Sequence, residues 1–326
     1  MMAYFLAVDG GQTTTRALVG TADGRILGSG LGGPANHYHE PGGPERLSAA
    51  LTVSVERALH SAGVSAEQVR YVFLGMTGAA NEARALIQQI LPHAMVSADH
   101  DSVSALAGAS RLQPGVVVIA GTGSVAFGRR ADGQSARAGG WGYLMGDEGS
   151  AYDIGIQAMR AAAQSEDGRV TASTLEQRIP EALGCSSLES LHNRLYAGQI
   201  TRDEIAGLAR VVAEQAADAD QCSLAILTVA GEHLARAAVA VLRRLEALEA
   251  GLPVFPTGGV FKAGAPVLGP FTTAVARTAR ASHVLHPAYP PVVGAFFLAL
   301  AMGGVLLSER VEQNLAQTLS SVIIPY

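Results

Sequence analysis

Two stretches of the chain repeat the same order of apolar and glycine-rich segments. The apolar run 5–8 leads into a glycine loop, a second apolar run and an Ala-Asp-Gly turn at 22–24. The apolar run 116–119 leads into another glycine loop, another apolar run and an Ala-Asp-Gly turn at 131–133. Asp-Gly between apolar runs is a strong hairpin signal, because glycine accepts a positive φ without steric cost. The repeat indicates two related half-domains, each beginning with a three-stranded meander.

Helix-like and strand-like patterns alternate after each meander. In the first half we expect a helix over 44–62, a strand over 69–76, a helix over 81–91 and a strand over 94–97. In the second half we expect helices from about 149, a long helical region over 203–250 and a strand over 253–256. Strands that are separated by helices pair in parallel, so the pattern predicts an α/β fold with a mixed sheet in each half.

The length of 326 residues exceeds that of most single domains, which favours two domains with a cleft between them. We expect the first domain over 1–114 and the second over 115–290, with a C-terminal helix over about 291–326 that packs back on the first domain. The polar segment 165–200 suits a helical insertion on the second domain. No low-complexity linker separates the halves, so the boundary near Gln113 should be a hinge.

Composition narrows the class of function. A net charge of -5 and the near absence of lysine argue against nucleic-acid binding. The N-terminus shows no secretory signal, and the apolar run 292–302 is too short to span a membrane, so we expect a cytoplasmic protein without membrane contact. Cys185 and Cys222 lie far apart in the sequence and form no metal-binding or redox spacing.

The glycine loops have the chemistry of phosphate-binding loops. Successive backbone N–H groups in a turn form a nest for phosphate oxygens, and glycine lets the ligand approach closely. Neither loop has the spacing of the P-loop or the Rossmann fingerprint. A third glycine pair follows the strand expected over 253–256 and offers a flat surface for adenine and ribose. The candidate nucleotide-binding residues are Gly10, Gly11, Gln12, Thr13, Gly121, Thr122, Gly123, Gly258, Gly259 and Lys262.

Asp9 stands at the edge of the first loop. Carboxylates in phosphate sites hold Mg²⁺ directly or through water, so Asp9 is the candidate metal ligand. The alternative is a structural role, in which the Asp9 side chain caps the hairpin as an Asx-turn.

The three glycine motifs together resemble the phosphate-1, phosphate-2 and adenosine motifs of the actin, sugar-kinase and chaperone ATPase superfamily. The segment 139–152, GGWGYLMGDEGSAY, resembles the signature of the N-acetylglucosamine kinase branch, which is grouped with the BadF/BadG/BcrA/BcrD ATPases. The likeness covers essentially the whole chain. It implies two ribonuclease-H-like (actin-like ATPase) domains with a duplicated mixed sheet and a central cleft. It also implies ATP and Mg²⁺ as cofactors, and transfer of the γ-phosphoryl group to the 6-hydroxyl of N-acetylglucosamine or a related hexosamine.

The resemblance also implies roles for single residues. Asp101 matches the general base, and a carboxylate that accepts the proton of a sugar hydroxyl typically contributes about 10²–10⁴-fold to the rate. Asp101 precedes a helix expected over 102–111, so helix capping is the alternative role, and Asp99 is the nearest rival as base. The positions that match the sugar pocket of the family are Asn36, Ser124, Gly140, Trp141, Gly142 and Asp147.

Several alternatives stay open. Val125 stands where human-type members carry a polar amide, so free glucosamine or another hexosamine competes with N-acetylglucosamine as the substrate. A BadF-type ATPase that activates a partner enzyme would need cysteines near the domain interface to ligate an iron–sulfur cluster. A non-catalytic sugar sensor is a third reading. The composition does not decide the oligomeric state, and a homodimer is possible.

Overall fold

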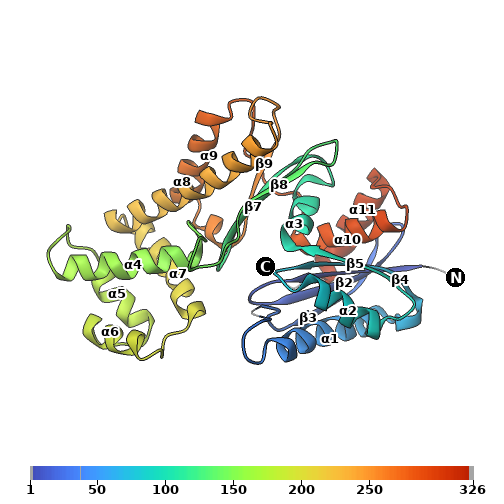
Figure 1. The fold of residues 1–326 in the computed structure, drawn as a ribbon, viewed down its shortest axis with the longest axis horizontal. Helices are drawn as coiled ribbons and strands as arrows, with labels where there is room; N and C mark the ends of the chain where they lie inside the picture. Colours follow the sequence, from blue (N-terminus) through green and yellow to red (C-terminus); the bar gives the residue numbers. More distant parts are fainter. Residues whose placement is uncertain (1–2, 37, 323–326) are drawn as a thin grey trace. The chain divides into compact units, whose positions relative to one another are not determined.

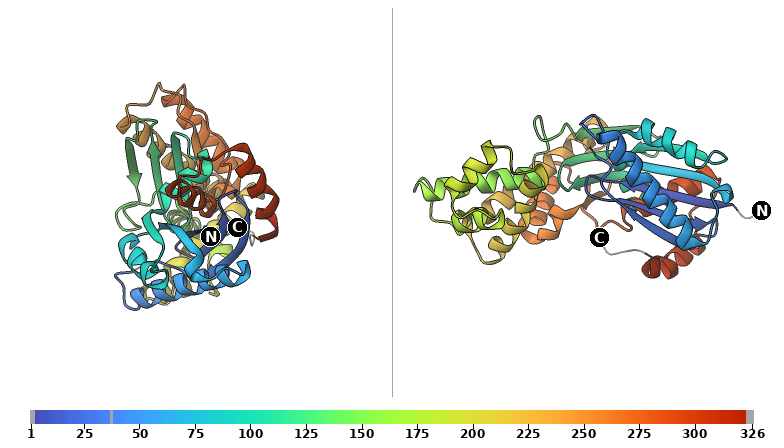
Figure 2. Two further views of the ribbon diagram at one scale, coloured as in Figure 1. Left: turned by 90° about the vertical axis from the view of Figure 1, so that its right-hand side faces the viewer. Right: turned by 90° about the horizontal axis from the view of Figure 1, so that it is seen from below.

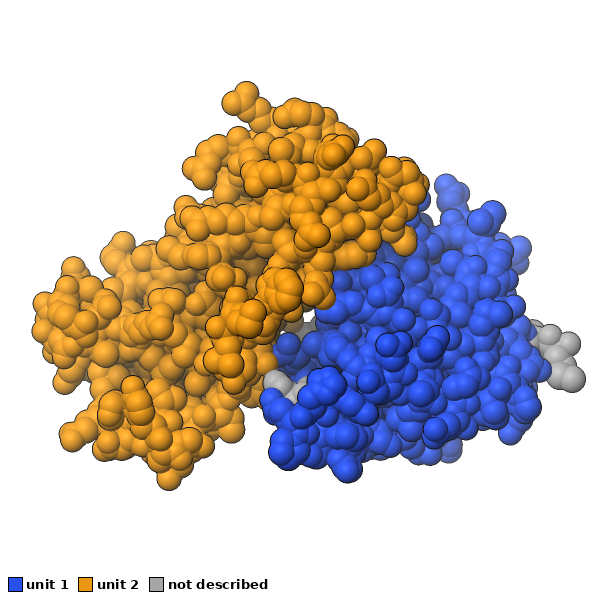
Figure 3. All heavy atoms as spheres, in the orientation of Figure 1, with its two compact units in different colours: residues 1–113, 287–326 blue, residues 114–286 orange. Residues whose placement is uncertain are grey.

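The computed structural model describes residues 3–36 and 38–322. The chain divides into two compact units (Figure 3), of which unit 1 comprises residues 1–113 and 287–326 and unit 2 comprises residues 114–286. Unit 1 therefore contains both ends of the chain, and unit 2 is a continuous stretch between them. Each unit is described here by itself.

Unit 1 is built on a five-stranded mixed sheet (Figure 1) with the order β3-β2-β1-β4-β5. The first three strands form the antiparallel meander expected from the sequence, and β4 and β5 extend the sheet in parallel with β1. The strands are β1 (Tyr4–Gly10), β2 (Thr15–Thr21), β3 (Ile26–Gly32), β4 (Val69–Met76) and β5 (Met95–His100). The mixed sheet predicted for the first half is confirmed.

Helices cover both faces of this sheet (Figure 2). Successive side chains of β1 point to opposite faces, so Leu6 and Val8 join one core and Phe5 and Ala7 join the other. The first core is closed by α1 (Gly43–Ala62) and α2 (Ala80–Ile90), and a short 3-10 turn, η1 (Ala66–Gln68), precedes β4. The second core is closed by α10 (Pro291–Met302) and α11 (Glu309–Val322), with α3 (Asp101–Ser110) packed against α10.

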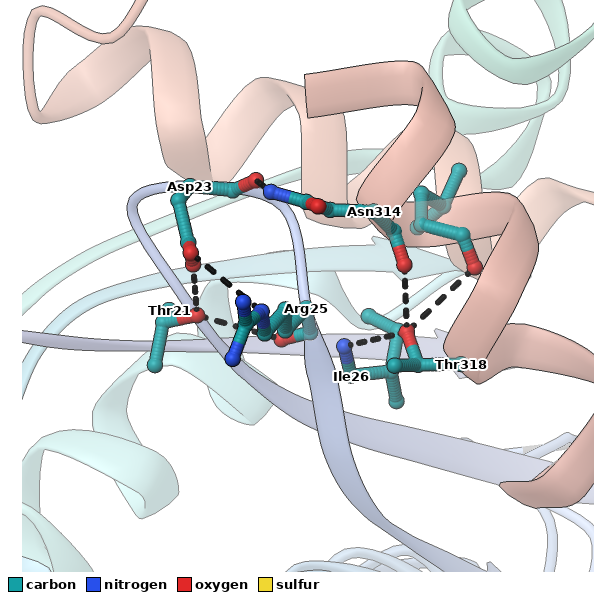
Figure 4. A network of polar contacts seen from close by, with 7 residues as sticks. Thr21, Asp23, Arg25, Ile26, Asn314 and Thr318 are labelled. Atoms are coloured by element: carbon teal, nitrogen blue, oxygen red, sulfur yellow. Dashed lines mark hydrogen bonds and ion pairs between the residues drawn. The ribbon is translucent and has the colours of Figure 1, made fainter. Parts of the chain in front are cut away.

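The C-terminal segment forms two helices, which corrects the expectation of one helix over about 291–326. The chain leaves α10 at Gly303, and Gly304 takes a positive φ of 74° that ends the helix. After this break α11 docks on the β2–β3 hairpin (Figure 4), where Asn314 Nδ2 donates to the Asp23 carbonyl at 2.7 Å. The Ile26 N–H donates to Thr318 Oγ1 at 2.9 Å. Residues 323–326 of the expected helix lie outside the described residues.

Unit 2 repeats the strand arrangement of unit 1. Its four-stranded sheet has the order β8-β7-β6-β9, in which β6, β7 and β8 form an antiparallel meander and β9 is parallel to β6. The strands are β6 (Gly115–Ala120), β7 (Ser124–Arg129), β8 (Ser135–Gly139) and β9 (Val254–Thr257). Because β3-β2-β1-β4 in unit 1 has the same order and directions, the duplication inferred from the sequence is confirmed.

Seven helical segments complete unit 2. They are α4 (Ala151–Glu166), α5 (Leu175–Ala182), α6 (Leu188–Tyr196), α7 (Arg202–Ala217), α8 (Gln221–Arg244), the 3-10 helix η2 (Gly259–Ala263) and α9 (Ala265–Thr278). The helical region expected over 203–250 consists of two helices, α7 and α8, which are separated where Ala219 takes a φ of 64° and Asp220 caps α8. By length and composition α8 could cross a membrane, but its inward face packs in the core of unit 2.

Candidate active site

In unit 1, three polar side chains gather where parallel strands end. Asp9 lies near the end of β1, Thr77 follows β4, and Asp101 follows β5. In open α/β sheets, ligands bind outside the carboxyl ends of parallel strands. This edge of the sheet is therefore the candidate catalytic edge of unit 1.

Asp101 is held by two neighbours. Thr77 Oγ1 donates to Asp101 Oδ2 at 2.5 Å, and His100 Nδ1 lies 2.8 Å from Oδ1. Burial acts most strongly on this carboxyl and would raise its pKa, but the contacts with His100 and Thr77 outweigh burial and lower the pKa below the usual value. Asp101 thus stays ionised, as a proton acceptor must.

The capping role considered for Asp101 belongs to its neighbour. His100 is the N-cap of α3, and its Nδ1 lies 3.3 Å from the Ser102 nitrogen. Asp101 is the first residue of the helix itself, where a carboxylate also interacts favourably with the helix dipole. Asp99 is exposed, and its Oδ1 accepts the His100 N–H at 2.7 Å. Asp101 is therefore the better-positioned base of the two.

Asp9 has a strongly perturbed carboxyl group. Burial, followed by the negative charge of Asp101, raises the pKa of Asp9 from 3.8 to about 7, and the positive charge of Arg16 opposes the shift. The two carboxylates interact with each other, and the buried Asp9 carboxyl is poorly compensated, so the pair is suited to a cation. Mg²⁺ is usually bound by one or two carboxylates together with substrate phosphates, so these residues fit the metal that the family resemblance implies.

The first glycine loop is fixed at its ends and open in its middle. The Gly10 carbonyl accepts the Thr77 N–H at 2.9 Å, and the Gly11 N–H donates to the Thr14 carbonyl at 3.0 Å. Among the described residues, the N–H groups of Gln12 and Thr13 donate to no protein atom. Two successive free N–H groups of this kind form a small anion-binding nest.

The second loop, residues 121–123 of unit 2, has the same property. Its Gly121 carbonyl accepts the Ala151 N–H at 2.8 Å from the first turn of α4, which fixes the loop to that helix. Within the described part of the chain, the N–H groups of Thr122 and Gly123 have no protein acceptor. The two loops therefore present matched pairs of free donors, one in each unit.

The third glycine pair lies beside the second loop. Gly258 has a φ of 104°, and a Cβ added there would lie 2.3 Å from the Ala120 carbonyl oxygen, so only glycine lets β9 approach the end of β6 so closely. A Cβ added at Gly259 would meet nothing within 4 Å, which leaves its backbone accessible. Lys262 follows in η2. The nucleotide candidates of unit 2 thus lie on two adjacent parallel strand ends.

The predicted sugar-pocket residues are divided between the units. Asn36 is 8% exposed and follows β3 in unit 1. The segment 139–150 of unit 2, here called the signature loop, carries Gly140, Trp141 and Gly142, and Trp141 is 65% exposed. The structure brings Ser124 together with Asp147 of the signature loop, because the Ser124 N–H donates to Asp147 Oδ1 at 3.2 Å.

The sequence prediction missed three residues of these clusters. Thr77 immediately follows a strand that was expected correctly, so a search for polar residues at strand ends would have found it. His100 directly precedes Asp101 in the sequence. Its capping role became visible only in the structure, where α3 begins at Asp101. Arg202 bonds to Asp147 across 55 positions of the sequence, and no local pattern marks it.

Comparison with known proteins agrees with this arrangement. The family model of the BadF/BadG/BcrA/BcrD ATPase family matches residues 6–299. The chain belongs to this family. An N-acetylmuramic acid/N-acetylglucosamine kinase from Clostridium acetobutylicum is 34% identical over 264 residues, which cover 79% of this chain and 86% of that protein. An N-acetyl-D-glucosamine kinase from Dictyostelium discoideum is 26% identical and covers 91% of this chain and 97% of its own length.

Solved structures give the same picture of the family. A candidate N-acetylglucosamine kinase from Chromobacterium violaceum superimposes with a TM-score of 0.73 at 29% identity, and the match covers 92% of this chain and 99% of that one. A ROK family glucokinase from Streptomyces griseus, solved with glucose and AMPPNP, matches with a TM-score of 0.57 at 20% identity, over 91% of this chain and 99% of that chain. The second match supports the sugar-kinase fold alone. The predicted fold and the predicted family are both confirmed.

Proposed function

We propose that the protein is an ATP-dependent amino-sugar kinase that transfers the γ-phosphoryl group to the 6-hydroxyl of N-acetylglucosamine or a related hexosamine. Membership of the family and the names of the two kinase relatives support this function. The single observation that carries it is the geometry of the Asp101 carboxylate, which contacts Thr77 and His100 at the same strand edge as Asp9.

Each cluster has a role in this proposal. The free amides of the two glycine loops bind phosphate oxygens of ATP, and Gly258, Gly259 and Lys262 lie at the adenosine. Asp9 would hold Mg²⁺, which neutralises charge on the phosphates. Asp101 accepts the proton of the attacking hydroxyl. Asn36, Ser124 and the signature loop recognise the sugar.

The relatives leave the identity of the hexosamine open. One is named for both N-acetylmuramic acid and N-acetylglucosamine, and a third relative, a glucosamine kinase from Vibrio cholerae, is 27% identical over 51% of this chain. Val125 lies on β7 directly after Ser124, and its side chain would lie 3.1 Å from a Cβ at Gly140. The valine side chain has no hydrogen-bond donor or acceptor. It therefore cannot make a polar contact with a substituent on the sugar nitrogen.

The two cysteines give no support to the alternative of an iron–sulfur activator. Both thiols are free, and Cys185 is buried in the core of unit 2.

We propose a cytoplasmic enzyme whose partner is its small-molecule substrate.

A panel of sugars tests the proposal. Purified protein with MgATP should release ADP in the presence of N-acetylglucosamine, N-acetylmuramic acid or glucosamine, and glucose should give a much lower kcat/KM. Release of ADP at the same rate with and without every sugar would contradict a kinase and favour an ATPase.

A further inference from the structure

Asp147 lies directly beneath the second glycine loop. Its side chain is only 5% exposed, and a Cβ added at Gly123 would lie 2.8 Å from Asp147 Oδ2. The carboxylate also takes the Ser124 N–H on Oδ1. Asp147 therefore packs against the second glycine loop. Its own backbone adopts the left-handed conformation, with a φ of 64°.

This placement creates an electrostatic conflict. The free N–H groups of Thr122 and Gly123 suit a phosphate, whereas an ionised carboxylate just below them repels one. The repulsion is strong in a site from which water is partly excluded, because fewer solvent dipoles screen it. A loop that binds ATP in this way needs a compensating positive charge close to Asp147.

Arg202 supplies that charge. Its Nη2 lies 3.2 Å from Asp147 Oδ2, and the Arg202 side chain is 17% exposed. The guanidinium carbon lies 4.8 Å from the ring centroid of Tyr143 and 5.8 Å from that of Tyr152, and the two rings contact each other edge to face at 5.1 Å. Three elements thus fix the guanidinium group, namely α7, the signature loop and the start of α4.

The position of Arg202 in α7 indicates that its ion pair with Asp147 is not needed to start this helix. Arg202 is the first residue of α7, after the N-cap Thr201, and a cation at a helix N-terminus is opposed by the helix dipole. The helix already has a complete capping box between Thr201 and Glu204, so α7 does not need Arg202 in order to begin. The contacts of Arg202 instead go to Asp147 and the two tyrosines.

We propose that Arg202 is a positioning residue that neutralises Asp147 beneath the 121–123 loop and so permits this loop to bind the phosphates of ATP. The inference rests on the proposed function, because it assumes that the loop binds ATP. Arg202 acts through Asp147 and does not itself touch the nucleotide.

Binding of MgATP to four proteins tests the inference by isothermal titration. Arg202→Gln should raise the Kd about tenfold, because it leaves the Asp147 charge uncompensated. The double variant Asp147→Asn/Arg202→Gln should return to within about threefold of the wild-type Kd, because both charges are removed. Arg210→Gln, a matched control at an exposed arginine of the same helix, should leave the Kd unchanged.

The outcomes separate the two proposals. An unchanged Kd for Arg202→Gln, or a double variant that binds as weakly as Arg202→Gln, would overturn the role of Arg202. Wild-type protein that does not bind MgATP would overturn the proposed function itself. If Arg202→Gln does not fold, Arg202→Lys tests the role of Arg202 instead. The lysine keeps the positive charge and should keep the Kd for MgATP near that of the wild type. The lost contacts with the tyrosine rings should lower the Tm.

Discussion

Replacing Asp9 by Asn should stabilise the protein in the absence of Mg²⁺ and nucleotide, although Asp9 belongs to the candidate site. The folded-state pKa of Asp9 is about 7, raised by burial and by Asp101 from 3.8. The folded protein therefore holds the Asp9 proton in a pH range where the unfolded chain has lost it. Stability falls as the pH rises from about 4 to about 7, and the full loss is present above pH 7.

The size of the effect follows from the two pKa values. At 1.36 kcal/mol per pH unit, the shift from 3.8 to about 7 corresponds to an upper value of about 4 kcal/mol at pH 8. Asparagine carries no charge, so Asp9→Asn should raise the urea midpoint at pH 8 and leave it nearly unchanged at pH 4. The gain should come with a loss of kinase activity, since the variant lacks the carboxylate proposed to hold Mg²⁺.

Asp23 provides a control of opposite sign in the same unit. Its pKa is lowered, chiefly by the hydrogen bond from Thr21 (Figure 4), so its contribution to stability is present at neutral pH and is lost in acid. Asp23→Asn should therefore lower the urea midpoint at pH 8. A midpoint for Asp9→Asn that stays equal to the wild type from pH 4 to pH 8 would refute the account of the Asp9 environment.

Three further predictions concern the site. Asp101→Asn should reduce kcat by about 10²–10⁴-fold while MgATP still binds, as measured by steady-state kinetics and titration; near-normal turnover would remove Asp101 as the base. Thr77→Val should raise the pKa of Asp101, because a donor to the carboxylate is lost, and move the acidic limb of the pH–kcat/KM profile to higher pH; an unmoved limb would contradict this role. Gly258→Ala should lower the Tm, since its Cβ would lie 2.3 Å from a carbonyl oxygen at φ 104°, whereas Gly259→Ala should not; equal Tm values would refute the packing argument.

The sequence was sufficient for the parts of the fold that depend on local pattern. The strand expected over 69–76 is β4 to the residue, and the helix expected over 44–62 begins one residue earlier as α1. The duplicated meanders were visible because each repeats an apolar run, a glycine loop and an Asp-Gly turn. These features are fixed by residues next to one another in the chain.

The break between α7 and α8 was harder to predict, because the residue that adopts the positive φ is an ordinary helix former. Ala219 ends the first part of the region expected over 203–250 by adopting a positive φ, and alanine normally favours helix. The break between α10 and α11 lies at Gly303 and Gly304, but the place where α11 docks depends on Asn314 and Thr318, which contact a hairpin almost 300 residues away. Tertiary contacts therefore set the position of α11.

The candidate site shows the same division. Asp9, the glycine loops and Asp101 lie at the ends of strands, where a sequence pattern can locate them. The partners that set their charge cannot be located in this way, since Thr77 reaches Asp101 across 24 positions and Arg202 reaches Asp147 across 55. Sequence reasoning therefore identified the groups proposed to act on substrate better than the groups that position them.

Transfer of the labelled γ-phosphoryl group of ATP tests the central claim most directly. With N-acetylglucosamine present, the label should appear in a sugar phosphate esterified at the 6-hydroxyl, and little should appear as inorganic phosphate. Label that is recovered only as inorganic phosphate, whichever amino sugar is supplied, would contradict an amino-sugar kinase.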